Sequence, residues 1–158
     1  MRWLVGVDFG TGDLPHYDLA QSESKIELVM YFNVLKSIGY PLKAVVCDGN
    51  PSIPKAAHFV FGKDLVIQLC TKHFINGLKR LLPADGLSDE TRMRLEKIIS
   101  LIKYVIEADT LEDANENLQN LKMFSSTFNH AIKRKCIKLF QYHKDTLCAH
   151  LLYPELHL

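Results

Sequence analysis

An apolar run, Ala44 to Cys47, ends abruptly at an acid and turn-forming residues, Asp48 to Pro51. This pattern predicts a buried strand with a carboxylate at its carboxyl end, because a continuous apolar run suits a strand covered on both faces. In open α/β sheets, that end of a strand is where ligands and metals bind. The run therefore predicts an α/β fold with Asp48 as a candidate site residue. The alternative is that Asp48 and Gly49 only form a turn, where both residue types are favoured.

A second apolar run, residues 65–69, leads directly into a Cys-x-x-His sequence and a helical pattern. Cys70 and His73 are three residues apart, so they lie on one face of the first helical turn and could share a ligand. They would supply half of a zinc site, which normally takes four ligands. The alternative is a buried thiol beside a hydrogen-bonded imidazole.

Strand and helix signals alternate over residues 1 to about 82. Residues 3–9 and 16–20 predict two strands joined by a Gly-rich hairpin turn. A helix is expected to begin near Ser22 to Ser24. Its expected inward face consists of Ile26, Val29, Met30 and Val34. With the strand before Asp48, a helix over about 51–61 and the strand 65–69, the alternation predicts an α/β layer with parallel pairing.

After residue 83 the strand signals stop, and every pattern is helical. Ser88 is expected to cap one helix, and Thr110, with Asp113 three residues on, to cap another. The apolar stripe of the first of these helices has helical spacing and comprises Leu95, Ile98, Ile99, Ile102, Val105 and Ile106. A third helix is expected over about 126–147. We therefore expect two segments, residues 1–82 as an α/β core and residues 83–158 as an all-helical unit.

The composition is that of an ordinary globular chain, with 158 residues, 47% hydrophobic and 23% charged. A net charge of +1 provides no global attraction to nucleic acid. The four cysteines lack CxxC spacing and one of them, Cys47, falls in a predicted buried strand, which favours a reducing compartment. Because neither a signal peptide nor an apolar run of about 20 residues is visible, we expect no membrane association. The cytoplasm is the expected location, or the nucleus in a eukaryote.

Two local clusters of basic residues could contact the phosphates of DNA. They comprise Lys72, Lys79 and Arg80 in the first half of the chain, and Lys133, Arg134 and Lys135 in the second. The alternative is that each cluster is simply a solvated helix face.

The segment around Asp8 resembles the first phosphate motif of the actin, Hsp70 and sugar-kinase ATPases, in which a strand ends in Asp-x-Gly-Thr. In such an ATPase fragment, Asp8, Gly10, Thr11 and Gly12 would contact nucleotide phosphate. The chain has no second comparable phosphate loop and no Gly-Gly adenosine motif. The simpler interpretation is a strand followed by a Gly-rich hairpin.

The order strand, Asp48-Gly49, helix, strand, Cys-x-x-His, helix resembles the catalytic core of Mutator-like transposases, the MULE group of DDE enzymes with a ribonuclease-H-like fold. The resemblance covers nearly the entire chain. It implies that Asp48 is a catalytic acid and a ligand of Mg²⁺ or Mn²⁺, and that Cys70 and His73 lie near the active centre. The implied function is metal-dependent DNA cleavage and strand transfer in DNA transposition. The implied partners are transposon ends, target DNA and a second copy in a homo-oligomer.

This chain differs from the family pattern at two of the family's catalytic acids. The family's first Asp lies on a strand before the segment that matches residues 3–9, and its last Glu follows the helical insertion that residues 84–158 resemble. We therefore expect an incomplete ribonuclease-H-like core, lacking the first strand and the final helix, followed by an all-helical insertion. A two-metal site needs more than one carboxylate, so the chain by itself is not expected to cleave DNA. A non-catalytic remnant that binds DNA or a partner through its helical half is the remaining alternative.

Overall fold

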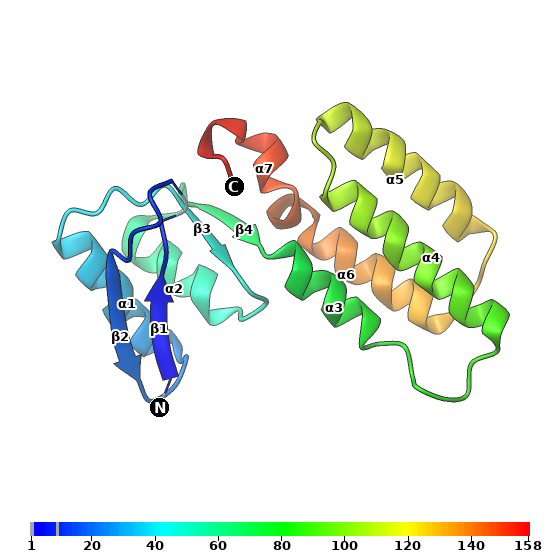
Figure 1. Cartoon of the computed structure of the whole chain (residues 1–158), viewed down its shortest axis with the longest axis horizontal. Coiled ribbons are helices and arrows are strands. Elements are labelled where there is room, and N and C mark those ends of the chain that lie inside the picture. The colour runs from blue at the N-terminus through cyan, green and yellow to red at the C-terminus, as the bar shows by residue number, and fades with distance from the viewer. Residues whose placement is uncertain (1, 9) are drawn as a thin grey trace. The chain divides into compact units, whose positions relative to one another are not determined.

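The computed structural model describes residues 2–8 and 10–158, with a mixed α/β architecture that contains two small sheets (Figure 1). Contacts divide the chain into two compact units, one of residues 1–68 with 153–158 and one of residues 69–152. The sequence predicts the division after residue 82 instead. In the structure, the segment that follows Leu69 groups with the later helices because its helix packs against the next one.

The first unit begins with the expected β-hairpin. Strand β1 (Arg2–Gly6) pairs antiparallel with β2 (His16–Ala20), and Val5 lies opposite Tyr17. The expected end of the first strand, Phe9, lies outside the described residues. The Asp8 carboxylate shapes the connecting turn, since its Oδ1 accepts hydrogen bonds from the backbone N–H groups of Gly10 at 2.8 Å and Thr11 at 3.0 Å.

Helix α1 (Lys25–Ser37) begins where the sequence predicts, with Ser24 as a cap that accepts a hydrogen bond from the N–H of Glu27. The prediction of which face is buried is wrong. Ile26 is 74% exposed and Met30 is 62% exposed, and Val34 is also exposed. The buried residues are Leu28, Tyr31, Phe32 and Leu35. This face is the buried one because the rings of Tyr31 and Phe32 pack against residues elsewhere in the unit. Tyr31 packs on the ring of His16 at 5.1 Å and Phe32 packs on Phe61 at 6.4 Å, measured between ring centroids.

The second sheet pairs β3 (Ala44–Cys47) with β4 (Val66–Leu69), and α2 (Ser52–Phe61) connects the two strands. The last three residues of β4 are buried, as the sequence predicts. In β3 only Cys47 is buried and the three residues before it are half-buried, so the prediction of a fully buried strand there is wrong. Ala56 and Ala57 of α2 are fully buried, and their small side chains allow the close contact between α1 and α2. A hydrogen bond between His58 Nε2 and the Leu65 carbonyl, at 2.9 Å, ties α2 to the start of β4.

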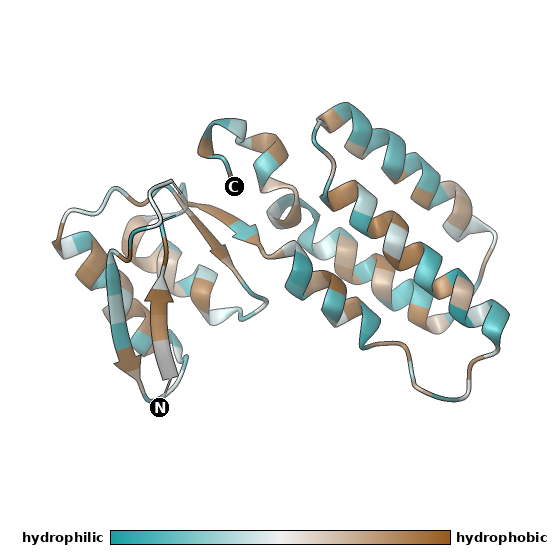
Figure 2. Ribbon diagram, in the orientation of Figure 1, coloured by the Kyte–Doolittle hydropathy of each residue, from teal (hydrophilic) through white to brown (hydrophobic). Residues whose placement is uncertain are grey.

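The second unit is built from helices α3 (Thr71–Lys79), α4 (Asp89–Ile106), α5 (Leu111–Ser126), α6 (Ala131–Leu147) and α7 (Ala149–Leu152). The predicted stripe of α4 is buried along its whole length, and α5 and α6 both pack against α4. Figure 2 shows the hydrophobic residues of α4 recurring along the helix between polar ones. A short 3₁₀ helix, η1 (Pro154–Leu156), belongs to the first unit.

The helix starts predicted in the second unit are confirmed at two places and wrong at a third. The Ser88 side chain accepts from the N–H of Thr91, and the Thr110 side chain accepts from the N–H of Asp113. The third helix begins at Ala131 rather than near residue 126, because Ser126 still belongs to α5. Within the part of the chain that the structure describes, no helix combines the length and the apolar character needed to cross a membrane.

Candidate functional site

Asp48 stands at the carboxyl end of β3, as the sequence predicts. Cys47 is buried, whereas Asp48 directly after it is exposed, so the chain passes from core to surface within one residue. Asp48 Oδ1 accepts a hydrogen bond of 2.9 Å from the N–H of Asn50. The carboxylate therefore closes a turn and is also exposed to solvent at the end of a short strand.

A second carboxylate is joined to this turn through Asn50. The Asn50 side-chain amide donates to Glu23 Oε2 at 3.1 Å, while its carbonyl oxygen accepts from the N–H of Ser52 at 2.9 Å. In the sequence Glu23 belongs to a predicted helix start, and no local signal connects it to residue 50. Carboxylate and amide oxygens are the donors that Mg²⁺ and other hard cations prefer. Among residues 2–8 and 10–158, however, no three His, Cys, Asp or Glu side chains are grouped closely enough to hold a metal ion.

Cys70 and His73 are brought together as the spacing predicts. Cys70 is the N-cap residue of α3, and its Sγ lies 3.1 Å from Nδ1 of His73 in the first turn. Cys70 is half-buried and His73 is exposed, so the pair is accessible from solvent rather than enclosed. Both residues belong to the second unit, whereas Asp48 belongs to the first.

The two basic clusters differ in how their side chains are engaged. Lys133 donates to the Ser125 carbonyl at 2.9 Å, and Arg134 donates to Asn129 Oδ1 at 2.6 Å, so these two cations support the turn between α5 and α6. Lys135 is exposed, as are Lys72 and Lys79 on α3 and Arg80 at its end. A contact between these residues and DNA stays a prediction.

Hydrogen bonds from other residues of the chain stabilise the turn around Asp8. Tyr40 donates its hydroxyl to Asp8 Oδ2, and this bond together with the N–H groups of Thr11 and Gly10 lowers the pKa of the Asp8 carboxyl. The same bond raises the pKa of Tyr40 to about 12. Since the N–H groups of Gly10 and Thr11 donate to Asp8, they are engaged inside the turn rather than offered to a phosphate group.

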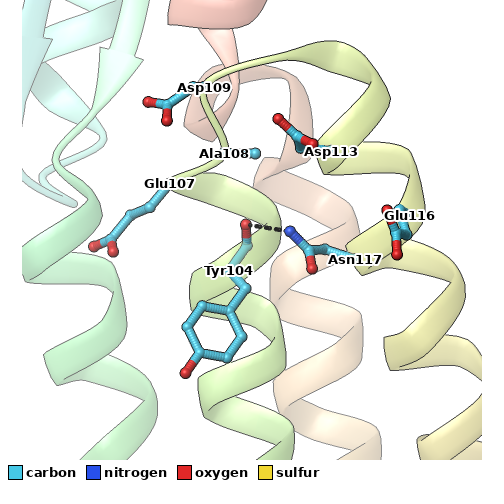
Figure 3. Close-up of a pocket in the computed structure, with 7 residues that line it drawn as sticks. All are labelled: Tyr104, Glu107, Ala108, Asp109, Asp113, Glu116 and Asn117. Atoms are coloured by element: carbon cyan, nitrogen blue, oxygen red, sulfur yellow. Dashed lines mark hydrogen bonds between the residues drawn. The ribbon is translucent and has the colours of Figure 1, made fainter.

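Two hollows of the second unit lie where the sequence gives no local signal. The first, of about 380 Å³, lies where α4 turns into α5 and is lined by acidic side chains (Figure 3). These are Glu107, Asp109, Asp113 and Glu116. On its wall, Asn117 donates to the Tyr104 carbonyl at 3.1 Å. Acids near the start of α5 suit the helix dipole, so their presence there has a structural explanation.

The second hollow, of about 630 Å³, runs along α3 and α4. Its lining combines apolar residues such as Ile75 and Ile99 with the cations Lys79, Arg92 and Lys103. Arg92 is already used structurally, since its guanidinium donates to the carbonyls of Pro83 and Ala84 at 2.7 and 2.8 Å. Among the candidate site residues predicted from the sequence, Lys79 lines this hollow.

The candidate residues are thus distributed over both units. Asp8, Glu23 and Asp48 lie in the first unit, and Cys70, His73 and the basic clusters lie in the second. Comparison with protein families, curated proteins and solved structures finds no match to this chain.

Proposed function

We propose that this chain is a catalytic-core segment of a Mutator-like DDE transposase, in which Asp48 is one of the metal-binding acids. The observation that carries the proposal is the position of Asp48, exposed at the carboxyl end of strand β3 and directly after the buried Cys47. Two-metal phosphoryl transfer requires carboxylates on rigid elements that hold two cations about 3.5–4 Å apart. A strand end provides that rigidity, and it is also where open α/β sheets bind ligands.

The order of the elements supports the same proposal. A hairpin, a helix, the Asp48 strand, a helix, a strand and the Cys-x-x-His helix follow one another, and a helical unit comes after them. This is the order that the resemblance to Mutator-like transposases implies. In the complete enzyme, the pairs β1–β2 and β3–β4 would belong to one ribonuclease-H-like sheet, and the helices after residue 83 would be its insertion.

The donor atoms at the end of β3 are of the type that suits Mg²⁺ or Mn²⁺. Asp48 would hold the cation, and Glu23, tied to the same turn through Asn50, would be an additional carboxylate on this side. When bound, such a cation would activate the attacking hydroxyl and stabilise the leaving oxygen. Asp48 and Glu23 do not complete a two-metal site, so the remaining acids would come from other parts of the full transposase. We accordingly expect no DNA cleavage by this chain alone.

DNA would be the partner of the complete enzyme, at transposon ends and at the target. The exposed cations Lys72, Lys79, Arg80 and Lys135 would neutralise phosphates, an interaction that weakens with salt. No observation favours the ATPase alternative, because the N–H groups that would bind phosphate in the Asp8 turn donate to Asp8 itself.

Metal binding at Asp48 can be tested with the variant Asp48→Asn, measured by thermal unfolding with and without millimolar Mn²⁺. An asparagine can still accept the hydrogen bond from the Asn50 N–H, so the turn is kept while the charge is removed. We expect Mn²⁺ to stabilise the wild-type chain, by about 1.4 kcal/mol when the free metal is tenfold above its dissociation constant, and not to stabilise Asp48→Asn.

The matched control is Asp64→Asn, which removes another exposed carboxylate of the first unit, before β4. This variant should respond to Mn²⁺ as the wild type does. Equal stabilisation of wild type and Asp48→Asn, or none in either, would remove Asp48 from a metal site and leave the transposase proposal without its central residue.

A further inference from the structure

The second hollow, of about 630 Å³, lies between two helices that run in opposite directions. Figure 1 shows α3 and α4 side by side, with the connecting segment, residues 80–88, turning the chain back between them. Each helix contributes a buried isoleucine to the lining, Ile75 at 6% and Ile99 at 3% exposed. These two residues and the half-buried Leu82 form the apolar floor of the hollow. Its volume is within the range of about 300–1,000 Å³ that is typical of ligand sites.

Positively charged side chains lie at both ends of the apolar floor. On α3, Lys79 follows Ile75 by one helical turn, and both line the hollow. On α4, Lys103 follows Ile99 in the same way. Because the helices are antiparallel, the two lysines mark opposite ends of the floor, and Arg92, near the start of α4, lies at the Lys79 end. Arg92 and Lys103 are separated along α4 by about three turns, or about 16 Å.

The two lysines are available to a partner. Among residues 2–8 and 10–158, the ammonium group of Lys79 has no hydrogen bond and no ion pair, and it is exposed. Lys103 is paired with Glu107 at 3.5 Å, but both side chains are more than two-fifths exposed, so this pair is weak. The lining as a whole carries three cations and one carboxylate, Glu96, so it attracts negative charge.

We propose that the second hollow binds an acidic amphipathic helix of a protein partner. Helices of this kind place their apolar face in a groove, here on the apolar floor, and their anchoring side chains recur every three or four residues. A helix of about three turns spans the 16 Å between the ends, so its carboxylates reach both Lys79 and Lys103. The site involves neither Asp48 nor a metal ion, so it goes beyond the transposase proposal and does not rest on it.

The charges around the hollow favour such a helix over two other occupants. A small amphiphile with a single charged head would engage the cations at one end only. A nucleic-acid strand carries negative charge along its whole length, which Glu96 inside the hollow would repel. Tyr104 also lines the first hollow, so the acidic side chains of that hollow lie directly beside this one and add to the repulsion.

The test measures the binding of labelled synthetic peptides to the full chain by fluorescence anisotropy. The first peptide is a helix of about four turns with leucines along one face and glutamates in its first and last turns. The second has lysines in place of the glutamates, and the third has the composition of the first with the leucines moved off the common face. We expect the first peptide to bind, and the other two to bind about tenfold more weakly or not at all.

Charge reversal of the protein locates the site. Lys79→Glu and Lys103→Glu should each weaken binding of the glutamate peptide about tenfold, and the double variant should prefer the lysine peptide. The matched control is Lys97→Glu, since Lys97 is exposed on α4 outside the hollow. This variant should bind as the wild type does. Circular dichroism checks that all the variants are folded.

Three results would overturn the proposal. The first is equal binding of the glutamate and lysine peptides, and the second is a loss in Lys97→Glu as large as that in Lys79→Glu. The third concerns DNA, because Lys79 is also one of the cations proposed to neutralise phosphates. A labelled DNA oligonucleotide that depends on Lys79 and Lys103, together with no binding of the glutamate peptide, would assign the hollow to phosphate contacts instead.

Discussion

The bond between Tyr40 and Asp8 joins residues that are far apart in the chain. Tyr40 follows α1 and Asp8 lies in the hairpin turn, so the bond ties the turn to the end of the helix. It lowers the pKa of Asp8 below its ordinary 3.8 and raises the pKa of Tyr40 from 10.0 to about 12. Both shifts favour the state in which the carboxylate is charged and the phenol is neutral.

Removing the phenol with Tyr40→Phe should reduce stability in a pH-dependent way. A lowered carboxyl pKa contributes stability that is present above 3.8 and is lost as pH falls through the folded value. A raised phenol pKa contributes stability that is present below 10.0 and is lost as pH rises through about 12. The difference in Tm between wild type and Tyr40→Phe should therefore be largest between about pH 4 and pH 10 and shrink toward both ends.

Thermal unfolding over a pH series measures this difference. The control is Tyr142→Phe, since Tyr142 is 82% exposed and belongs to α6 of the other unit. A Tm difference for Tyr40→Phe that stays constant across the whole pH range would show that the hydroxyl contributes by packing alone.

At the scale of elements, helix α1 carries two apolar faces. One, with Leu28, Tyr31, Phe32 and Leu35, is buried, and the other exposes Ile26, Met30 and Val34 at intervals of four residues. Periodicity alone does not distinguish them, because both follow the spacing of a helix. The choice depends on partners that come from β2 and α2, which are outside the helix itself.

Two substitutions in α1 separate the faces by their effect on the free energy of unfolding. Leu35 is 3% exposed, so Leu35→Ala should cost about 2–5 kcal/mol through lost burial and an internal cavity. Met30 is 62% exposed, so Met30→Gln should change stability by about 0.5 kcal/mol or less. Denaturant unfolding followed by circular dichroism gives both values. A larger loss for Met30→Gln than for Leu35→Ala would mean that the exposed face is the one that packs in solution.

At the scale of the whole molecule, the chain consists of two compact units. Each has its own buried residues, such as Phe32 and Ala56 in the first and Ile102 and Phe140 in the second. When separate cores exist, a single two-state transition is not the default expectation.

Hydrogen exchange can show whether the units respond separately to a core substitution. Ile102 is fully buried in α4, so Ile102→Ala should cost about 2–5 kcal/mol and reduce amide protection in α3 to α6. Leu35→Ala should reduce protection in α1, α2 and the hairpin instead. An equal loss of protection across both units from either substitution would indicate one cooperative structure.

Several local features were predictable from the sequence because their signals lie within a few residues. The caps at Ser24, Ser88 and Thr110 depend on a side chain and an N–H three residues away. The buried stripe of α4 and the exposure of Asp48 directly after an apolar strand likewise follow from local hydropathy. The contact between Cys70 and His73 was predictable because one helical turn brings them together.

The sequence by itself therefore determined the hairpin, the starts of α1, α4 and α5, and the position of Asp48. Only the tertiary structure decided which face of α1 is buried, that Glu23 joins the Asp48 turn through Asn50, and that Tyr40 holds Asp8. It also decided that α3 groups with the later helices. The physical reason is the separation along the chain. Propensity, capping and periodicity act between residues that are only a few positions apart. Side chains that are 27 or 32 residues apart meet only after the elements between them have packed.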